Sequence, residues 1–315
     1  MPVTTEEVRA ELGRSLGRAI TRLERRSSEY RTSFAVEELD VWTDDGEPLR
    51  LVLKDVSPDG LSENARAAKP DFLFDPMREI ETYRTVLASL ELGTARCVVA
   101  HADPDHSSYW LVIERVDGVE LFQVGDFAIW EEAARWLAAM HARDREVGAP
   151  GLLRYGRTHY ERWLPRAREY TGAPELDRLA AGYDAVVERL LALPASFVHG
   201  ELYASNVLVC GRLPNLRVCP VDWEMAAIGP GLVDLAALST GNWDEDERHA
   251  LANAYFEAAA RPEPREALDE GLECCRLHLA VQWLGWSPDW TPPAEHAQDW
   301  LSEALRAAEK LGIRC

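Results

Sequence analysis

The stretch that decides the fold is "FVHGELYASNVLV", residues 197–209. Its apolar ends predict two short buried strands, and the polar residues between them predict an abrupt loop. The loop holds Glu201 and Asn206 five residues apart, between two elements that keep it rigid. A charge and an amide placed in this way indicate a chemical role for the loop. His199, directly after the first strand, is the residue we expect to support the loop rather than to react.

A second polar position follows the next apolar strand. The segment "VCPVDWEM", residues 218–225, places Asp222 sixteen residues after Asn206. Asn206 and Asp222 each stand at the end of a strand and offer oxygen ligands. Because Mg²⁺ typically takes one or two protein carboxylates together with phosphate oxygens, the pair predicts a magnesium site.

The first half of the chain contributes a cation and its partner. Lys54 lies in "LRLVLKDV", residues 49–56, and Glu79 lies one helical turn before Tyr83 in "REIETYRTVL". Taken alone, Lys54 is better read as an edge-strand lysine and Glu79 as a solvated helix charge. Taken together with the loop acid, Asn206 and Asp222, they follow the order of parts that phosphoryl transfer from ATP requires. In that order the lysine binds phosphate, Glu79 aims it, and Glu201 orients the acceptor hydroxyl.

Periodicity predicts two lobes joined by a short connector. A helix is expected from residue 4 to about residue 24, where Val8, Leu12, Leu16, Ile20 and Leu23 form one stripe. Strands are expected at 33–42, 48–56, 95–103 and 108–116, with one helix at 75–91. From Asp126 the chain is expected to be mostly helical. We therefore predict an α+β chain with a nucleotide-binding lobe at residues 1–116 and a helical lobe at 117–315, which carries the catalytic loop and the acceptor site.

Composition excludes some classes of partner. The chain has 34 basic and 54 acidic residues and a net charge of −20, which argues against nucleic-acid binding. The acidic surplus is compatible with a cationic ligand, but we favour solubility as its explanation. No apolar run is long enough to span a membrane, and the start reads as an acidic, capped helix. Six cysteines show no metal-site or C-x-x-C spacing, so we expect a cytoplasmic protein with reduced thiols, either a monomer or a homodimer.

These motifs resemble the aminoglycoside phosphotransferase and choline kinase-like family, the small-molecule branch of the protein-kinase-like fold. The resemblance runs from about Lys54 to about Trp286. The family's H-G-D-x-x-x-x-N pattern is matched by His199, Gly200, Glu201 and Asn206, and its D-[FW]-E triplet by Asp222, Trp223 and Glu224. Further matches are the hinge "WLVIERVDGVEL" at 110–121, the helix "ARWLAAMHA" at 134–142, and "GPGLVDLAAL" at 229–238 with a buried aspartate, Asp234.

The resemblance implies a kinase-like, two-lobed fold with ATP and Mg²⁺ as cofactors. Adenine would bind the hinge backbone near Glu114 and Val116, Lys54 would contact the phosphates, and Asn206 and Asp222 would hold the metal. The loop that covers the nucleotide is usually rich in glycine, but no glycine stands between Gly17 and Gly46 here. Hydroxyl groups at Ser27, Ser28, Thr32 and Ser33 are the phosphate donors that remain, and GTP stays open as an alternative nucleotide.

Glu201 stands where the family has aspartate. It carries the same charge, but its carboxylate reaches about one methylene further, and a misplacement on the order of 1 Å costs ~10²-fold in rate. Lys54, Asn206 and Asp222 all remain, so we expect a working enzyme. The alternative is a weak or inactive relative that binds nucleotide or ligand.

The acceptor is expected to be a small hydroxylated molecule that binds the helical lobe. The residues predicted to bind it are Tyr203, Glu224, Asp244, Trp283 and Trp286, with Trp290 beside them. Acids at a cleft suit an amine-bearing substrate such as an aminoglycoside, whose phosphorylation confers antibiotic resistance. A nucleoside antibiotic or a natural-product intermediate is also open. For Asp244 taken alone, we favour its interpretation as part of a helix start over a role in acceptor binding. A protein kinase is disfavoured, because V-D-W-E replaces D-F-G.

Overall fold

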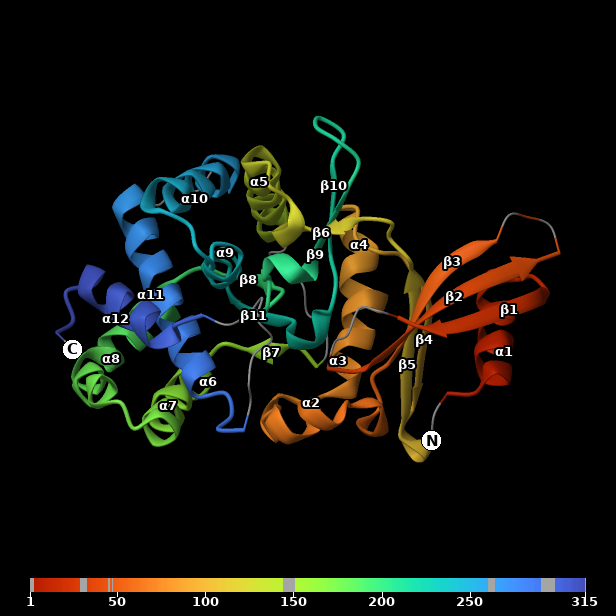
Figure 1. Ribbon diagram of the computed structural model, residues 1–315, viewed down its shortest axis with the longest axis horizontal. Coiled ribbons are helices and arrows are strands. Elements are labelled where there is room, and N and C mark those ends of the chain that lie inside the picture. Colours follow the sequence, from red (N-terminus) through yellow and green to blue (C-terminus); the bar gives the residue numbers. More distant parts are fainter. Residues whose placement is uncertain are drawn as a thin grey trace.

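The computed structural model describes residues 3–28, 33–44, 46, 48–143, 151–259, 264–289 and 298–314. Two lobes are visible in Figure 1, an antiparallel sheet with few helices and a larger helical lobe. The sheet has the strand order β1-β2-β3-β5-β4. Its strands are β1 (Ile20–Ser27), β2 (Ala35–Thr43), β3 (Leu49–Asp55), β4 (Cys97–Asp103) and β5 (Ser108–Glu114). The predicted antiparallel lobe is confirmed.

The first helix is shorter than predicted. Helix α1 (Thr5–Leu16) begins with a capping box between Thr4 and Glu7 and ends at Gly17, whose φ of 63° is left-handed. The expected continuation to about residue 24 is wrong, because a glycine in this conformation ends a helix and strand β1 begins at Ile20. A register shift between Ile20 and Arg22 lets the three-residue spacing of Ile20 and Leu23 occur in a strand.

An insert between β3 and the next long helix was not predicted. It contains the 3-10 helices η1 (Pro58–Gly60) and η2 (Asp71–Leu73) on either side of helix α2 (Glu63–Ala68). The helix expected at 75–91 is one helical run, made of α3 (Pro76–Glu81), the π-helical segment η3 (Thr82–Leu87) and α4 (Ala88–Leu90). This run lies between the sheet and the helical lobe (Figure 1).

The second lobe is mostly helical, as predicted. Its described helices are α5 (Phe127–Arg143), α6 (Arg157–Glu161), α7 (Trp163–Thr171), α8 (Pro174–Ala192), α9 (Leu232–Leu238), α10 (Glu245–Ala259), α11 (Arg265–Leu284) and α12 (Trp300–Lys310). A continuous apolar core runs through this lobe and reaches the α3–α4 run. A smaller core joins α1 to one face of the sheet.

Short strands interrupt the helical lobe and position the site. Strand β8 (Ala195–Val198) pairs with β11 (Ala227–Pro230), which also pairs with β7 (Leu153–Arg154). Strand β9 (Val207–Cys210) pairs with β10 (Arg217–Pro220) and with β6 (Val119–Glu120). The loop from residue 199 to residue 206 therefore connects two strands of different small sheets.

Two further expectations concern membrane-spanning helices and the state of the cysteines. Within the described parts of the chain, every helix is too short or too polar to cross a bilayer. The five cysteines in those parts are free thiols, whereas Cys315 lies outside the described residues.

Candidate active site

Buried acceptors fix the backbone of the loop at 199–206. The backbone N–H groups of His199 and Gly200 donate to the carboxylate of Asp234 on α9, at 2.7 and 2.9 Å. Gly200 has a φ of +86°, and a Cβ atom there would lie 2.3 Å from the carbonyl oxygen of Met225. Only glycine fits such a backbone without strain. Asp234 and Gly200 therefore determine where the side chains of the loop point.

His199 is fully buried beneath this loop. Its Nε2–H donates to the carbonyl oxygen of Val221 at 2.9 Å, and its Nδ1 accepts from the backbone N–H of Glu201 at 3.3 Å. Both ring nitrogens are thus used within the protein, and burial lowers the pKa of the imidazole. This geometry agrees with the supporting role expected for His199.

The structure brings Asn206 and Asp222 to the same cleft. Asn206 ends the 3-10 helix η6 (Ala204–Asn206), and its backbone carbonyl accepts from Val221 N–H at 2.9 Å, so the two positions are tied together. The Nδ2 atom of Asn206 donates to the carbonyl oxygen of Glu201 at 2.9 Å, so its amide oxygen is the end that can bind a cation. Asp222 has a φ of 66°, a conformation that is uncommon outside glycine and costs free energy.

Lys54, Glu79 and Asp222 form one buried ion cluster. The Nζ atom of Lys54 lies 2.6 Å from Oε2 of Glu79 and is also paired with Asp222. The other oxygen of Glu79 accepts from the backbone N–H of Trp223 at 3.3 Å. Burial opposes the charge of Lys54, but the carboxylates of Asp222 and Glu79 outweigh it and raise the pKa of the ammonium group. Lys54 is therefore a fixed cation aimed at the position of Asp222.

The cleft between the lobes has a volume of about 880 Å³. Apolar side chains from both lobes form part of its wall, among them Val36, Val52, Ile113 and Leu208. Seven of the residues predicted to bind nucleotide or metal also line it, namely Ser28, Lys54, Glu79, Glu114, Val116, Asn206 and Asp222. The Glu114 side chain is held by Arg217 at 2.7 Å, and this hydrogen bond lowers the pKa of the Glu114 carboxyl.

Glu201 and Glu224 lie beyond Asp222, outside the lining of this cleft. Glu224 belongs to the 3-10 helix η7 (Trp223–Met225) and is paired with Lys69, while Ser33 Oγ donates to its Oε1 at 2.9 Å. Burial raises the pKa of Glu201 to about 8, and the charges of Glu224 and Asp222 act in the same direction against Lys69 and Lys54. These two carboxylates, with Glu79 and Asp222, make four acids against two lysines.

The oxygen atoms of Asn206 and Asp222, together with the surplus of carboxylates around them, fit a divalent cation. The four carboxylates exceed the two ammonium groups by two charges, and the negative charges of Glu224 and Asp222 add to the effect of burial in raising the pKa of Glu201. Within the described residues no group of three or more His, Cys, Asp or Glu side chains is placed to hold a metal. A metal at Asn206 and Asp222 would thus need oxygen ligands from a nucleotide, as Mg²⁺ does in phosphate-binding sites.

Three of the residues predicted to bind the acceptor, Tyr203, Trp283 and Trp286, form one aromatic group. Trp283 donates from Nε1 to the hydroxyl oxygen of Tyr203, which belongs to the loop at 199–206. Trp286 is 7% exposed and packs between Trp163 and Trp283, with ring centroids 5.9 and 5.4 Å away. Tyr203 also lines a cavity of about 290 Å³ that shares Phe122 and Ser205 with the cleft.

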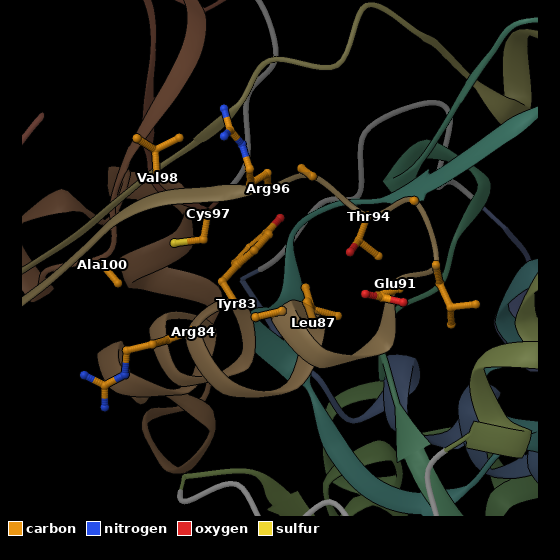
Figure 2. A pocket seen from close by; sticks show the side chains of 13 residues that line it. Tyr83, Arg84, Leu87, Glu91, Thr94, Arg96, Cys97, Val98 and Ala100 are labelled. Carbon is orange, nitrogen blue, oxygen red and sulfur yellow. The ribbon is translucent and has the colours of Figure 1, made fainter. Parts of the chain in front are cut away.

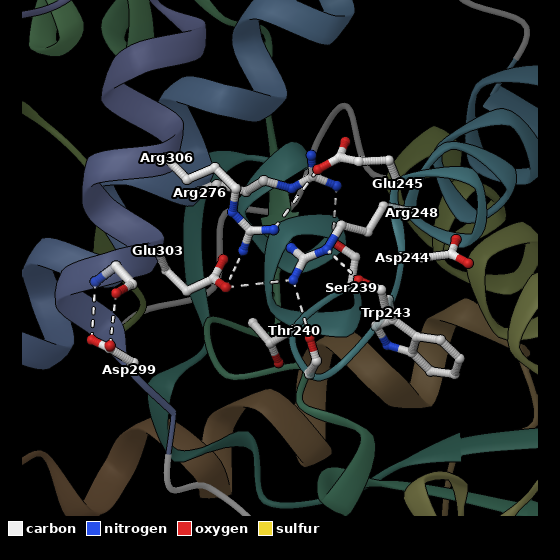
Figure 3. A network of polar contacts seen from close by, with 12 residues as sticks. Ser239, Thr240, Trp243, Asp244, Glu245, Arg248, Arg276, Asp299, Glu303 and Arg306 are labelled. Carbon is white, nitrogen blue, oxygen red and sulfur yellow. Dashed lines mark hydrogen bonds and ion pairs between the residues drawn. The ribbon is translucent and has the colours of Figure 1, made fainter.

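Asp244 has a different environment. Its carboxylate accepts from the backbone N–H of Glu247 at 2.8 Å at the start of α10. Figure 3 shows it pointing away from the network formed by Arg248, Arg276 and Glu303. This contact matches the interpretation of Asp244 as part of a helix start. The assignment of Asp244 to acceptor binding stays a prediction. Trp290 and Thr32 lie outside the described residues.

The sequence patterns missed Lys69, Ser33 and Arg78. Arg78 is buried and donates to the backbone oxygen of Glu224 at 2.8 Å, which anchors the segment at 222–224 to α3. The rarity of lysine in the sequence could have indicated Lys69. The chain has only three lysines beside 31 arginines, and two of the three, Lys54 and Lys69, lie at the site.

A separate cavity of about 460 Å³ lies between the α3–α4 run and residues 93–100 (Figure 2). Tyr83 lines both this cavity and the cleft, and its buried hydroxyl has no hydrogen-bond partner among the described residues. The helical run that carries Glu79 thus contributes to the walls of two cavities.

Comparison with known proteins decides the family. A model of the phosphotransferase enzyme family matches residues 36–270, which is more than half of the chain. The chain belongs to this family. Membership makes it a phosphotransferase whose acceptor is an alcohol group of a small molecule. No curated protein sequence matches the chain.

Solved structures of small-molecule kinases share the fold of this family member. A microcompartment-associated aminopropanol kinase is 16% identical, with 98% of this chain and 99% of that one covered and a TM-score of 0.64. An ethanolamine kinase from Plasmodium vivax is 11% identical, covering 97% and 86%, with a TM-score of 0.63. The GDP complex of aminoglycoside 2'-phosphotransferase-IIIa is 14% identical, covering 98% of both chains, with a TM-score of 0.57. At these identities the likeness confirms the kinase-like fold alone.

Proposed function

We propose that this phosphotransferase transfers the γ-phosphoryl group of ATP, with Mg²⁺, to a hydroxyl group of a small molecule. The observation that carries the proposal is the ion cluster in which Lys54 contacts both Glu79 and Asp222, all three lining a cleft of about 880 Å³. A lysine held by an acid on a helix, facing an acid of the other lobe, is the arrangement that phosphoryl transfer uses.

The side chains of the cleft then have separate roles. Lys54 binds nucleotide phosphate oxygens, and Glu79 keeps its ammonium group in place. The hinge near Glu114 and Val116 takes the base, and Ser28 offers a hydroxyl to the phosphates. Asn206 and Asp222 would hold Mg²⁺, which when bound neutralises the negative charge of the transferring group.

Glu201 faces the acceptor in this scheme. A carboxylate beside the acceptor hydroxyl orients it and receives its proton while the new bond to phosphorus forms. Burial, together with the negative charges of Glu224 and Asp222, raises the pKa of Glu201 to about 8, and a bound divalent cation would oppose the effect of those charges. The metal site and the acceptor carboxylate are thus linked electrostatically.

The acceptor class that fits best carries an amine as well as a hydroxyl. The site around Glu201 and Glu224 has more carboxylates than cations, and an ammonium group on the acceptor would be attracted to it. The three similar structures are named for kinases of aminopropanol, ethanolamine and aminoglycosides, each an amino alcohol or amino sugar. An aminoglycoside acceptor would make the enzyme a resistance determinant, and an amino-alcohol intermediate would make it metabolic.

The second candidate is a nucleotide-binding or ligand-binding protein with weak or no activity. The observations that favour it are Glu201 in place of aspartate and the absence of glycine between Gly17 and Gly46. Release of ADP from ATP, measured with ethanolamine, choline, aminopropanol, streptomycin and spectinomycin, separates the two candidates. An acceptor that raises ADP release at least tenfold above the acceptor-free rate supports the enzyme. Nucleotide binding without any acceptor effect supports the second candidate.

A further inference from the structure

Two lysine–carboxylate pairs lie side by side in the site. Lys54 is paired with Asp222 and Lys69 with Glu224, two residues further along the chain. The ring of Phe34 lies next to both ammonium groups, with its centroid 5.3 Å from Nζ of Lys54 and 5.5 Å from Nζ of Lys69. The two pairs are thus parts of one buried cluster.

The carboxylate of Glu224 is fully engaged. Its Oε2 binds the Lys69 ammonium group and its Oε1 accepts from Ser33 Oγ at 2.9 Å. The side chains of Lys69 and Glu224 are 7% and 9% exposed, so water does little to weaken the pair. Arg78 holds the backbone of Glu224 at 2.8 Å. Neither carboxylate oxygen is therefore available to a metal ion without displacing a partner.

The insert between β3 and α3 delivers Lys69 to this position. Helix α2 begins with a cap by Ser62, whose Oγ accepts from Ala65 N–H at 3.2 Å, and Lys69 follows the last residue of the helix. Its backbone N–H donates to Ala65 O at 2.8 Å. In a chain with 31 arginines and three lysines, the choice of lysine selects a compact ammonium ion over a flat guanidinium group.

Protein-kinase sites hold two Mg²⁺ ions, which neutralise the negative charge that develops during phosphoryl transfer. We propose that the ammonium group of Lys69 is a built-in substitute for the second divalent cation. It neutralises Glu224 permanently, so that the site takes a single divalent ion, at Asn206 and Asp222. This inference rests on the proposed function, because it assumes that nucleotide and metal bind in the cleft.

Metal counting tests the inference without turnover. Mn²⁺ bound per chain is measured by electron paramagnetic resonance at saturating AMP-PNP, a non-hydrolysable ATP analogue. We expect one Mn²⁺ ion in the wild-type complex. Lys69→Met leaves the buried Glu224 without a counter-charge, and we expect a second Mn²⁺ ion to bind. Lys69→Arg keeps the charge, and we expect one ion.

Two further variants serve as controls. Lys310 pairs with Glu245 at 2.8 Å on the surface and is 35% exposed, so Lys310→Met should keep one Mn²⁺ ion. The double variant Lys69→Met/Glu224→Gln removes both charges and should also keep one. Thermal unfolding and AMP-PNP affinity establish that each variant is folded.

The wild-type count is decisive even if the Lys69 variants do not fold. Two Mn²⁺ ions in the wild-type complex overturn the inference while leaving the proposed function intact. A folded Lys69→Met variant that still binds one ion overturns it as well. A wild-type chain that binds no Mn²⁺ with the nucleotide overturns the proposed function, and the inference with it.

Discussion

The Nζ atom of Lys54 on β3 lies 2.6 Å from the Oε2 atom of Glu79 on α3, and both side chains are almost fully buried. Lys54 also reaches Asp222 of the other lobe, so one ammonium group joins the sheet, the central helix and the segment at 222–224 that we propose to hold the metal. We expect Lys54→Met to lower kcat/KM by about 10²–10³-fold, because the phosphate-binding charge is lost.

The same substitution should destabilise the protein. Removing one partner of a buried ion pair leaves Glu79 and Asp222 uncompensated, which typically costs about 3–5 kcal/mol of unfolding free energy. Urea denaturation of Lys54→Met measures this cost, and Lys310→Met, at an exposed pair, serves as the control. A loss no greater than that of Lys310→Met would show that Lys54 is not a structural centre of the site.

Glu201→Asp tests whether the longer carboxylate is matched to its own acceptor. Shortening the side chain by about one methylene should move the carboxylate from the acceptor oxygen and lower kcat, on the order of 10²-fold for a shift near 1 Å. Steady-state kinetics with the best acceptor measures the change. A rise in kcat would instead identify the native site as a weakened one.

Glu201→Gln should change how the stability of the protein depends on pH. Because the pKa of Glu201 is raised to about 8 in the folded, ligand-free protein from an ordinary value of 4.5, its contribution to stability is fully present below pH 4.5 and is lost as the pH rises through 8. Glutamine cannot ionise, so the melting temperature of the variant relative to wild type should increase between pH 6 and pH 9. A pH-independent difference would contradict the raised pKa.

His278 on α11 predicts acid sensitivity of the helical lobe. Burial lowers its pKa from 6.5 to about 3, and its Nδ1 accepts from the hydroxyl of Tyr183 at 3.2 Å. The unfolded chain therefore binds a proton below pH 6.5 that the folded chain does not, and stability falls with pH. From these pKa values His278 contributes about 2 kcal/mol to the loss between pH 7 and pH 5.

Urea denaturation at pH 7 and pH 5 measures this effect. His278→Gln keeps an acceptor for Tyr183 but cannot be protonated in this range, so the difference between the two pH values should shrink by about 2 kcal/mol. His159, whose pKa is also lowered by burial, should supply part of the loss that remains. An unchanged difference would show that His278 is protonated in the folded protein.

Trp283 and Tyr203 should affect the acceptor rather than the nucleotide. Trp283→Phe removes the indole donor to the Tyr203 hydroxyl and loosens one side of the catalytic loop. A hydrogen bond of about 1 kcal/mol corresponds to roughly a fivefold rise in the KM for the acceptor, with the KM for ATP unchanged. Trp42→Phe, on strand β2, is the control. A rise in the KM for ATP alone would place Trp283 outside the acceptor site.

The sequence predicts those parts of the site whose signal is local. Glu201 and Asn206 stand between two apolar strands, and Asp222 follows a third, so spacing alone places them in one loop region. The pairing of Lys54 with Glu79 is also as expected, since each lies in a clearly periodic element. Periodicity failed after Gly17, because Ile20 and Leu23 suit a helical stripe and a bulged strand equally well.

Sequence periodicity and spacing do not predict contacts between residues that lie far apart in the chain. Lys69 and Glu224 are 155 residues apart in the chain. The insert at 56–75 shows no strong periodicity from which the position of Lys69 in the fold could be predicted. Ser33 reaches the same carboxylate from 191 residues away. Asp244 fails in the opposite way, because an acid before a helix has the same appearance whether it caps the helix or binds an amine.

The most direct test of the central claim is transfer of phosphate from γ-³²P-labelled ATP to an amino alcohol or amino sugar, compared between wild type and Asp222→Asn. Asparagine keeps the size of Asp222 but removes the charge that Lys54 contacts and that the metal would need. We predict labelled acceptor with the wild type and at least a 10²-fold lower rate with Asp222→Asn. The proposed phosphoryl transfer would be contradicted by wild-type protein that binds ATP but labels no acceptor. Equal rates for the two proteins would contradict the proposed role of Asp222.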